Sequence, residues 1–223
     1  AAFVDCGPGL SVPAMLQAWY PGIRGGEGIA ALLTGQVNPS GRLPVTWVTD
    51  ESQLPRPHID GLGFKPAKPF GDVFDFDIEG ANVGYKWMAA KGLTPTFAFG
   101  HGLSYTSFAY DNLKVSVEGS RLVASVDIRN TGKRAGADVA QLYLKLPAGS
   151  TTPIRLIGYD KVTLQPGEQR RIRIEAEPKT LAHYDAQARQ WKIDGGTYQG
   201  QLSRNAAEPL QTVDVQLVEQ VLR

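Results

Sequence analysis

The stretch RLVASVDIRNTGKRAGADVAQLYLKLP, residues 121–147, decides the fold class of this chain. Apolar and polar residues alternate in RLVASVDIRN and again in ADVAQLYLKLP, and a period of two is typical of half-buried strands. The segment between them, NTGKRAG, has the composition of a turn. The second run includes the apolar residues Val139, Leu142, Leu144 and Leu146. The stretch therefore predicts two strands joined by a turn.

The alternation continues on both sides of this stretch. Upstream, KVSVEG leads into RLVASVDIRN through Gly119 and Ser120, which is a hairpin signal. Downstream, LIGYDKVTL is followed by the turn sequence QPGE and then by EQRRIRIEAE. In this last run, Ile172 and Ile174 share one face of the expected strand. The opposite face carries Arg171, Arg173 and Glu175.

RQWKID, GTYQGQLS and TVDVQLVEQV bring the total to about seven or eight short strands, at intervals of roughly 8–12 residues. This spacing predicts an immunoglobulin/fibronectin type III-like antiparallel β-sandwich. We assign the sandwich to residues 97–223, with a core at about residues 113–223. That length is sufficient for an independent hydrophobic core.

Residues 1–47 follow a different, α/β pattern. AAFVDCG at the start and LPVTW at residues 43–47 are predicted strands. A helix is predicted at residues 27–33, because its apolar residues share one face and Gly35 is placed to end it. The predicted fold class is therefore an α/β fragment followed by an all-β domain.

Residues 48–96 join these two parts as a long loop and connecting segment. Several prolines and glycines in residues 48–69 argue against regular elements there. Long loops of this kind are often functional or wrap a neighbouring domain. Some order resumes in IEGANVGYKWM, residues 78–88.

Composition excludes several classes of protein. The chain has 223 residues and a net charge of +1, without the basic patch that is typical of nucleic-acid-binding proteins. No apolar run approaches the roughly 20 residues of a membrane-spanning helix, so we expect neither a nucleic-acid partner nor a membrane. With one cysteine, Cys6, no internal disulfide can form. The start lacks a methionine and lies within an expected strand, so we expect a fragment of a longer protein.

Few residues offer metal or nucleophile chemistry. The three histidines show no metal-ligand spacing and the lone cysteine cannot complete a site, so we expect no metal and no cofactor. GLSYT, residues 102–106, comes nearest to the GxSxG turn of a serine nucleophile, but it lacks the second glycine.

Carboxylates cluster in GDVFDFDIEG, which contains Asp72, Asp75, Asp77 and Glu79. One interpretation is general acid/base chemistry on a sugar, for which glycosidases use paired carboxylates. The other is a solvated loop or strand edge. The separation between carboxylates depends on the fold, so both interpretations stay open, with Asp75 and Glu79 as the candidate substrate-binding residues.

Several segments in the correct order resemble glycoside hydrolase family 3, of the β-glucosidase type. QAWYPGIRGGEGIAALLTGQVNPSGRLPVTW is similar to the family's PG-x-x-GG helix followed by VNPSGRLPVT. IEGANVGYKWMAAKGLTPTFAFGHGLSYTSF is similar to its EG-x-x-VGY motif followed by FG-[HY]-GLSYT. VDIRNTGKRAGADVAQLYLKLP and LIGYDKVTLQPGE resemble its fibronectin type III-like domain. The resemblance covers nearly the whole chain and places residues 1–47 in the C-terminal part of the family's α/β sandwich domain.

The resemblance implies a longer parent enzyme, a retaining β-glucosidase. In the family, the nucleophile is an Asp of a (β/α)8 barrel, and the acid/base is usually a Glu upstream of the PG-x-x-GG helix. Neither segment is in this chain, so it contains no catalytic residue, and Glu27 and Glu79 match motif positions that are not catalytic. The chain alone is predicted to be an inactive scaffold, whose loop at residues 48–79 could border the aglycone side of the site.

The expected partners are the upstream catalytic domains of the same protein and, through them, a β-glucoside or oligosaccharide substrate. Cysteine usage leaves the compartment open, and a periplasmic or secreted location is favoured for the parent enzyme.

Two alternatives stay open. The sandwich could be a carbohydrate- or partner-binding module, with Trp191 and Tyr198 as candidate exposed aromatic residues. The competing interpretation places both in the core, where large aromatic side chains usually pack. The parent could also be a β-xylosidase of the same family, because the specificity determinants lie mostly upstream.

FAFGHGLSYTSF, residues 97–108, lies where the α/β pattern gives way to the β pattern. Gly100 and Gly102 permit a tight chain reversal. Its large aromatic residues would contribute apolar area to a domain junction: Phe97, Phe99, Tyr105 and Phe108. We therefore predict a packing role for this motif, rather than a catalytic role for His101.

Overall fold

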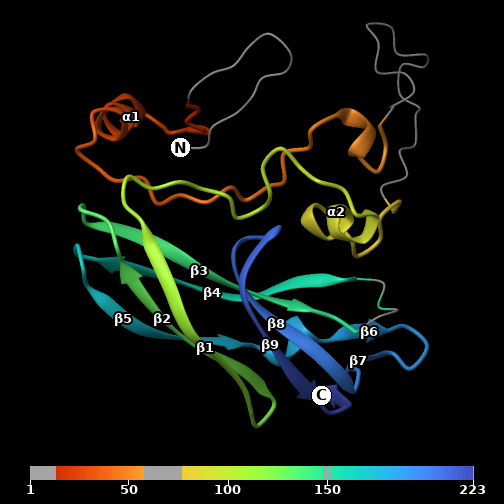
Figure 1. Cartoon of the computed structure of the whole chain (residues 1–223). Coiled ribbons are helices and arrows are strands. Elements are labelled where there is room, and N and C mark those ends of the chain that lie inside the picture. Colours follow the sequence, from red (N-terminus) through yellow and green to blue (C-terminus); the bar gives the residue numbers. More distant parts are fainter. Residues whose placement is uncertain (1–13, 58–76, 148–149, 151, 223) are drawn as a thin grey trace, which may run out of the picture.

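In the computed structural model, the chain forms a β-sandwich covered on one side by loops and short helices (Figure 1). The structure describes residues 14–57, 77–147, 150 and 152–222. The strand expected in AAFVDCG lies outside the described residues. The predicted fold class is confirmed: a short α/β portion precedes a fibronectin type III-like sandwich of antiparallel sheets.

Two antiparallel sheets form the sandwich. The first has the order β1-β2-β5 and consists of β1 (Phe108–Glu118), β2 (Arg121–Asn130) and β5 (Gln169–Ala176). The second has the order β4-β3-β8-β9 and consists of β4 (Ile154–Leu164), β3 (Gly136–Lys145), β8 (Gly196–Asn205) and β9 (Glu208–Leu217). The expected hairpin joins β1 to β2. The turn expected between β2 and β3 instead carries the chain from one sheet to the other.

A small third sheet contains one strand that was predicted, within RQWKID, and two that the sequence pattern does not separate. It has the order β10-β7-β6 and consists of β6 (His183–Asp185), β7 (Gln190–Ile193) and β10 (Gln220–Leu222). The short helix α3 (Pro178–Leu181) precedes it. The three-residue strands β6 and β10 are too short to show a clear alternation, so the described residues form ten strands where about seven or eight were predicted.

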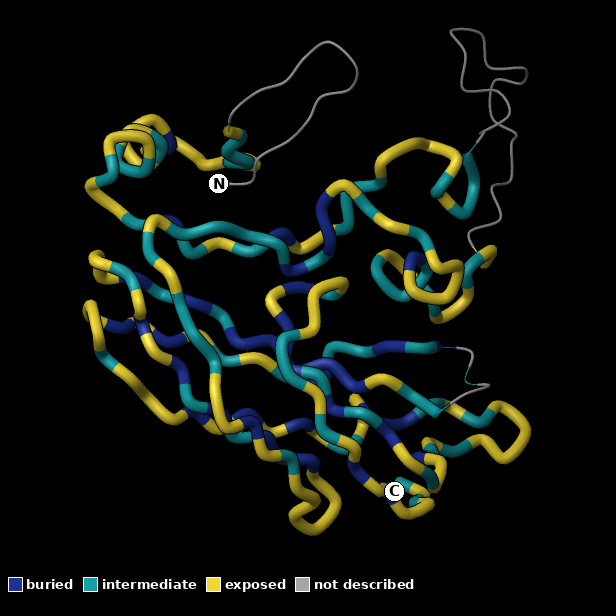
Figure 2. Tube along the Cα trace, viewed as in Figure 1, coloured by how far each residue is buried: buried dark blue, intermediate teal, exposed yellow. Residues whose placement is uncertain are grey.

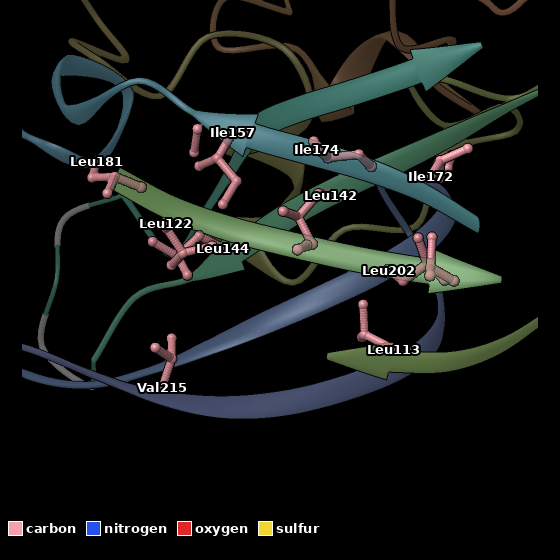
Figure 3. Packing of buried hydrophobic residues seen from close by; sticks show 14 of the residues in the cluster. Leu113, Leu122, Leu142, Leu144, Ile157, Ile172, Ile174, Leu181, Leu202 and Val215 are labelled. Carbon is pink, nitrogen blue, oxygen red and sulfur yellow. The ribbon is translucent and has the colours of Figure 1, made fainter. Parts of the chain in front are cut away.

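The core lies between the two large sheets (Figure 3). Its fully buried side chains include Leu122, Val126, Ile128, Leu142, Leu144, Leu164 and Leu202. As predicted, Ile172 and Ile174 of β5 are buried, and the residues that alternate with them are exposed. Each large aliphatic side chain that leaves water contributes about 1.5–3 kcal/mol to folding.

Residues 14–57 and 77–107 form the covering layer, which we call the cap (Figure 2). It holds α1 (Gly25–Leu33), the 3-10 helix η1 (Glu51–Gln53) and α2 (Tyr85–Lys91). The helix expected at residues 27–33 is confirmed and begins slightly earlier, at Gly25. None of the helices in the described residues has the length and hydrophobicity of a membrane-spanning segment.

The strand predicted at residues 43–47 is wrong, because only an isolated bridge between Trp47 and Phe97 remains. Trp47 and Phe97 exchange backbone hydrogen bonds of 2.8 and 3.2 Å. A second point of contact joins Leu43 to residues 100–101 through two bonds of 2.8 Å. Between these two points, Pro44 has no backbone N–H to donate, which interrupts the ladder.

Strand β3 is buried on both faces, because the cap covers the outer side of the four-stranded sheet. Side chains alternate along a strand, so Leu142 and Leu144 face the core while Gln141 and Tyr143 point to the other side. Gln141 and Tyr143 are nevertheless only 3% and 0% exposed. The Tyr143 ring meets the ring of Tyr85, from α2, edge-on at 5.8 Å. The cap is therefore seated on β3.

Candidate functional site

The predicted carboxylate cluster is described only in part. Asp72 and Asp75 lie outside the described residues. Asp77 is exposed, and Glu79 is half-buried in a turn before α2, where its carbonyl accepts a 3.0 Å hydrogen bond from the backbone of Asn82. The assignment of Asp75 and Glu79 to substrate binding stays a prediction.

The described histidines are not arranged for metal chemistry. In the described part of the chain, no group of three or more His, Cys, Asp or Glu residues is placed to hold a metal ion. The ring of His101 lies 5.2 Å from the ring of Phe97. Burial lowers the pKa of His101, so its imidazole is largely neutral at pH 7 and suits a packing role.

Three sets of polar contacts lie where the cap meets the sandwich, and the first is centred on Asp138 of β3. The Asp138 carboxylate accepts hydrogen bonds from the guanidinium of Arg42, in the cap, and from the hydroxyl of Tyr110, in β1. Arg42 also donates to the carbonyl of Gly102 at 2.6 Å. Burial raises the pKa of Tyr110 to about 12. The Tyr110 hydroxyl therefore stays protonated at neutral pH and remains a donor to the carboxylate.

A second set of contacts is centred on Gln141, on the outer face of β3. Its Nε2 donates to the carbonyls of Gly100, at 3.0 Å, and Arg204, at 2.8 Å. Its Oε1 accepts from the hydroxyl of Tyr143 at 2.8 Å. Gly100 has a φ of +83°, and a Cβ at this position would collide with the Gln141 side chain. Glycine is therefore required here both by the backbone conformation and by the close approach of the two segments.

A third set of contacts is centred on Asn38. Its Oδ1 accepts hydrogen bonds from the backbone of Tyr105, at 2.8 Å, and from the hydroxyl of Ser104, at 3.0 Å. Its Nδ2 donates to the carbonyl of Ala135 at 3.0 Å. The Tyr105 hydroxyl donates to the carbonyl of Leu32, at the end of α1. Asn38 thus joins the cap to the loop between β2 and β3.

The aromatic motif at residues 97–108 contributes packing to the same junction. Phe97 is buried and meets the Trp47 ring edge-on at 6.2 Å. Phe99 stacks on Tyr85 at 4.9 Å. The predicted packing role is confirmed for these two residues, whereas Tyr105 remains 42% exposed and contributes a hydrogen bond instead of buried area.

Arg42, Asp138 and Gln141 belong to no functional motif that can be recognised in the sequence. The partners Arg42 and Asp138 are separated by 96 positions, and no local pattern connects them. A usable signal was the presence of Asp138 and Gln141 within an otherwise apolar strand. Buried polar groups destabilise the folded state unless they are paired, so their position implied partners elsewhere in the chain.

The two aromatic residues proposed as binding candidates differ in their surroundings. Tyr198 is 3% exposed, and its hydroxyl donates to the carbonyl of Asp194 at 2.9 Å. The core interpretation is therefore confirmed for Tyr198. Trp191 is 40% exposed and packs edge-on against Tyr184 at 5.5 Å.

The side of the cap around α1 is apolar and open to solvent. Its exposed large apolar residues include Trp19, Tyr20, Ile23, Leu33 and Val37. Tyr20 and Ile23 are fully exposed, at 98% and 106%. Beside them, Leu16, Ile29, Leu32 and Val37 help to line an open hollow of about 460 Å³. Apolar surface gathered in this way usually marks an interface.

These features define a fibronectin type III-like sandwich that carries part of an α/β domain on its outer face. Residues 4–105 match the Glycosyl hydrolase family 3 C-terminal domain, and residues 138–206 match the Fibronectin type III-like domain. The chain therefore belongs to glycosyl hydrolase family 3.

Relatives of known name align along nearly the whole chain. Beta-glucosidase BoGH3A of Bacteroides ovatus is 31% identical over 214 residues, which cover 93% of this chain and 28% of that protein. Probable beta-glucosidase I of Aspergillus terreus is 35% identical over 94% of this chain and 26% of its own length. The structure of beta-glucosidase 3B from Thermotoga neapolitana in complex with glucose superimposes with a TM-score of 0.78 at 32% identity, covering 90% of this chain and 28% of that one. The chain thus spans about a quarter of the length of these relatives.

Proposed function

We propose that this chain is the non-catalytic C-terminal part of a retaining β-glucosidase, in which it serves as a scaffold. The observation that supports this most directly is the two-sided cap. Polar and aromatic contacts hold one side on β3, while the side around α1 presents apolar residues to solvent. Exposed apolar surface of this kind is typical of an interface. We assign the upstream part of the parent's α/β domain as the partner that packs against it.

The chemistry would then be divided between the two parts of the parent enzyme. An upstream Asp attacks the anomeric carbon, and an upstream Glu protonates the leaving oxygen and later activates water. This chain supplies neither group and is inactive by itself. The loop at residues 48–79 borders the aglycone side of the site, where Asp75 and Glu79 contact the substrate. The names of the relatives favour β-glucosides over β-xylosides as the substrate class.

Reconstitution tests this assignment. The chain and the upstream remainder of its parent protein are expressed separately and together, and hydrolysis of 4-nitrophenyl β-glucoside is measured. We expect turnover only from the combination. Ile23→Asp, on the fully exposed apolar side of the cap, should weaken reconstitution without changing the thermal unfolding of the chain.

The matched control is Val218→Asp, which places the same charge at an exposed apolar position on the sandwich. It should leave reconstitution unchanged. Turnover by the isolated chain, lost in Glu79→Gln, would contradict the scaffold assignment.

A further inference from the structure

An open groove of about 1050 Å³ lies between α2 and the region of β6 and β7, on the sandwich. Its cationic lining residues are Lys86, Arg155 and Lys179. Asp194 is the single acidic residue among its described lining residues. The groove therefore carries an excess of positive charge, although the net charge of the whole chain is only +1.

Lys86 and Arg155 are half-buried, and among the described residues neither has a carboxylate within ion-pair distance. The Nζ of Lys86 meets the carbonyl of Ala81 at 3.4 Å, and Nη1 of Arg155 donates to the carbonyl of Ala182 at 2.5 Å. Burial lowers the pKa of both groups, and the neighbouring Arg155 charge further lowers that of Lys86. An anion between two such cations would relieve their mutual repulsion.

The one acidic lining residue is engaged elsewhere. One oxygen of Asp194 lies 3.4 Å from Nδ1 of His183, and the other lies 3.7 Å from Nζ of Lys192. The Asp194 charge also acts on Arg155, whose pKa it raises, but among the described residues it forms no ion pair with Arg155 or Lys86. Charge complementarity points to an anionic ligand at this end of the groove.

The other side of the groove offers aromatic surface. Tyr184 and Trp191 are directly opposite each other on β6 and β7. They keep 51% and 40% of their surface exposed. The C–H groups on one face of a pyranose ring form an apolar surface that packs on such rings. Binding sites for small ligands combine apolar surface of this kind with a few polar groups that set orientation.

We propose that this groove is a non-catalytic binding site for an acidic oligosaccharide. A uronic-acid carboxylate would bind between Lys86 and Arg155, and a neighbouring sugar ring would pack against Trp191 and Tyr184. An acidic peptide would satisfy the two cations equally well, but it would not require the exposed aromatic pair, so the saccharide is favoured. The site is independent of the proposed function, because binding is measured without hydrolysis.

Calorimetric titration of the 223-residue chain tests the proposal. The probes are trigalacturonate and its neutral counterpart, galactotriose. We expect trigalacturonate to bind roughly tenfold more tightly than galactotriose, since a charge-assisted hydrogen bond is stronger than a neutral one. Added salt should reduce this difference.

Variants separate the two halves of the site. Lys86→Gln should weaken trigalacturonate binding roughly tenfold and galactotriose binding little, whereas Trp191→Ala should weaken both probes. The control is Lys161→Gln, because Lys161 is an exposed lysine of β4 that does not line the groove, and it should change neither. If Trp191→Ala does not fold, Tyr184→Leu gives the same comparison at the second ring.

Three outcomes would overturn the proposal. One is the absence of trigalacturonate binding at millimolar concentration, and another is equal affinity for the charged and neutral probes. The third is binding of hexaglutamate as tightly as trigalacturonate with no effect of the aromatic variants, which would identify the groove as an acidic-peptide site.

Discussion

The sandwich and the cap are stabilised in different ways. In the sandwich, continuous strand ladders enclose a core of fully buried aliphatic side chains. In the cap, the described residues form only short helices and isolated bridge residues, and three polar contact sets hold them on the sandwich. Regions with few buried apolar contacts open at lower free energy than the core. We therefore expect the cap to open before the sandwich unfolds.

The largest expected effect belongs to the sandwich core. Leu142→Ala removes a fully buried side chain between the sheets and should lower the free energy of unfolding by about 2–5 kcal/mol. Urea denaturation followed by far-UV circular dichroism measures this. Val117→Ala, at an exposed position of β1, is the control and should cost less than about 0.5 kcal/mol. If Leu142→Ala lowers the free energy of unfolding by less than the cap variants described below, the proposed difference between sandwich and cap is wrong.

The second-largest destabilisation is expected from loss of the ion pair between cap and sandwich. Asp138→Ala leaves Arg42 and Tyr110 without their acceptor and should destabilise the protein by about 3 kcal/mol. That is the low end for buried pairs, because Arg42 keeps 20% of its side chain exposed. Hydrogen exchange should report faster opening in the cap than in β2 and β5. The double variant Arg42→Met/Asp138→Leu should recover part of the loss, and no recovery would mean that the charge of Arg42 is not the cause.

A smaller effect is expected at the chain reversal of the cap. Gly100→Ala places an alanine at a strained φ and displaces Gln141 from its hydrogen bonds. We expect it to lower the free energy of unfolding by about 2 kcal/mol. Gly119→Ala is the matched control, since Gly119 also has a positive φ but open space around it, and it should cost about 1 kcal/mol. Limited proteolysis of the cap should separate the two variants. Equal sensitivity would show that the contact with Gln141 adds nothing.

The smallest effect lies on the exposed face of the sandwich and depends on pH. The hydrogen bond from Asn112, together with Arg171, lowers the pKa of Asp127 below its ordinary value of 3.8. A lowered folded-state pKa stabilises the protein above the unfolded-state value, and this contribution is lost as the pH falls through the folded-state pKa. Asp127→Asn should therefore lower Tm slightly at pH 6 and not at pH 2. An effect of Asp127→Asn that is equal at both pH values would contradict this origin.

Prediction from sequence succeeded where the relevant pattern was local. The alternation around Ile172 and Ile174 gave the faces of β5, and the apolar spacing before Gly35 gave α1. It failed at residues 43–47, where an apolar run that includes Pro44 does not form a full ladder. It also missed two strands of the small sheet, β6 and β10, which are too short to show periodicity.

The sandwich and the family motifs could be predicted from the amino-acid sequence, because alternation, turn composition and motif order are properties of neighbouring residues. Tertiary structure alone decided that β3 is covered on both faces, that Arg42 pairs with Asp138, and that Gly100 contacts Gln141. The groove between α2 and the small sheet was likewise assembled from distant segments. The physical reason is the same in each case: these contacts join residues tens of positions apart, and their geometry exists only after the sheets have packed.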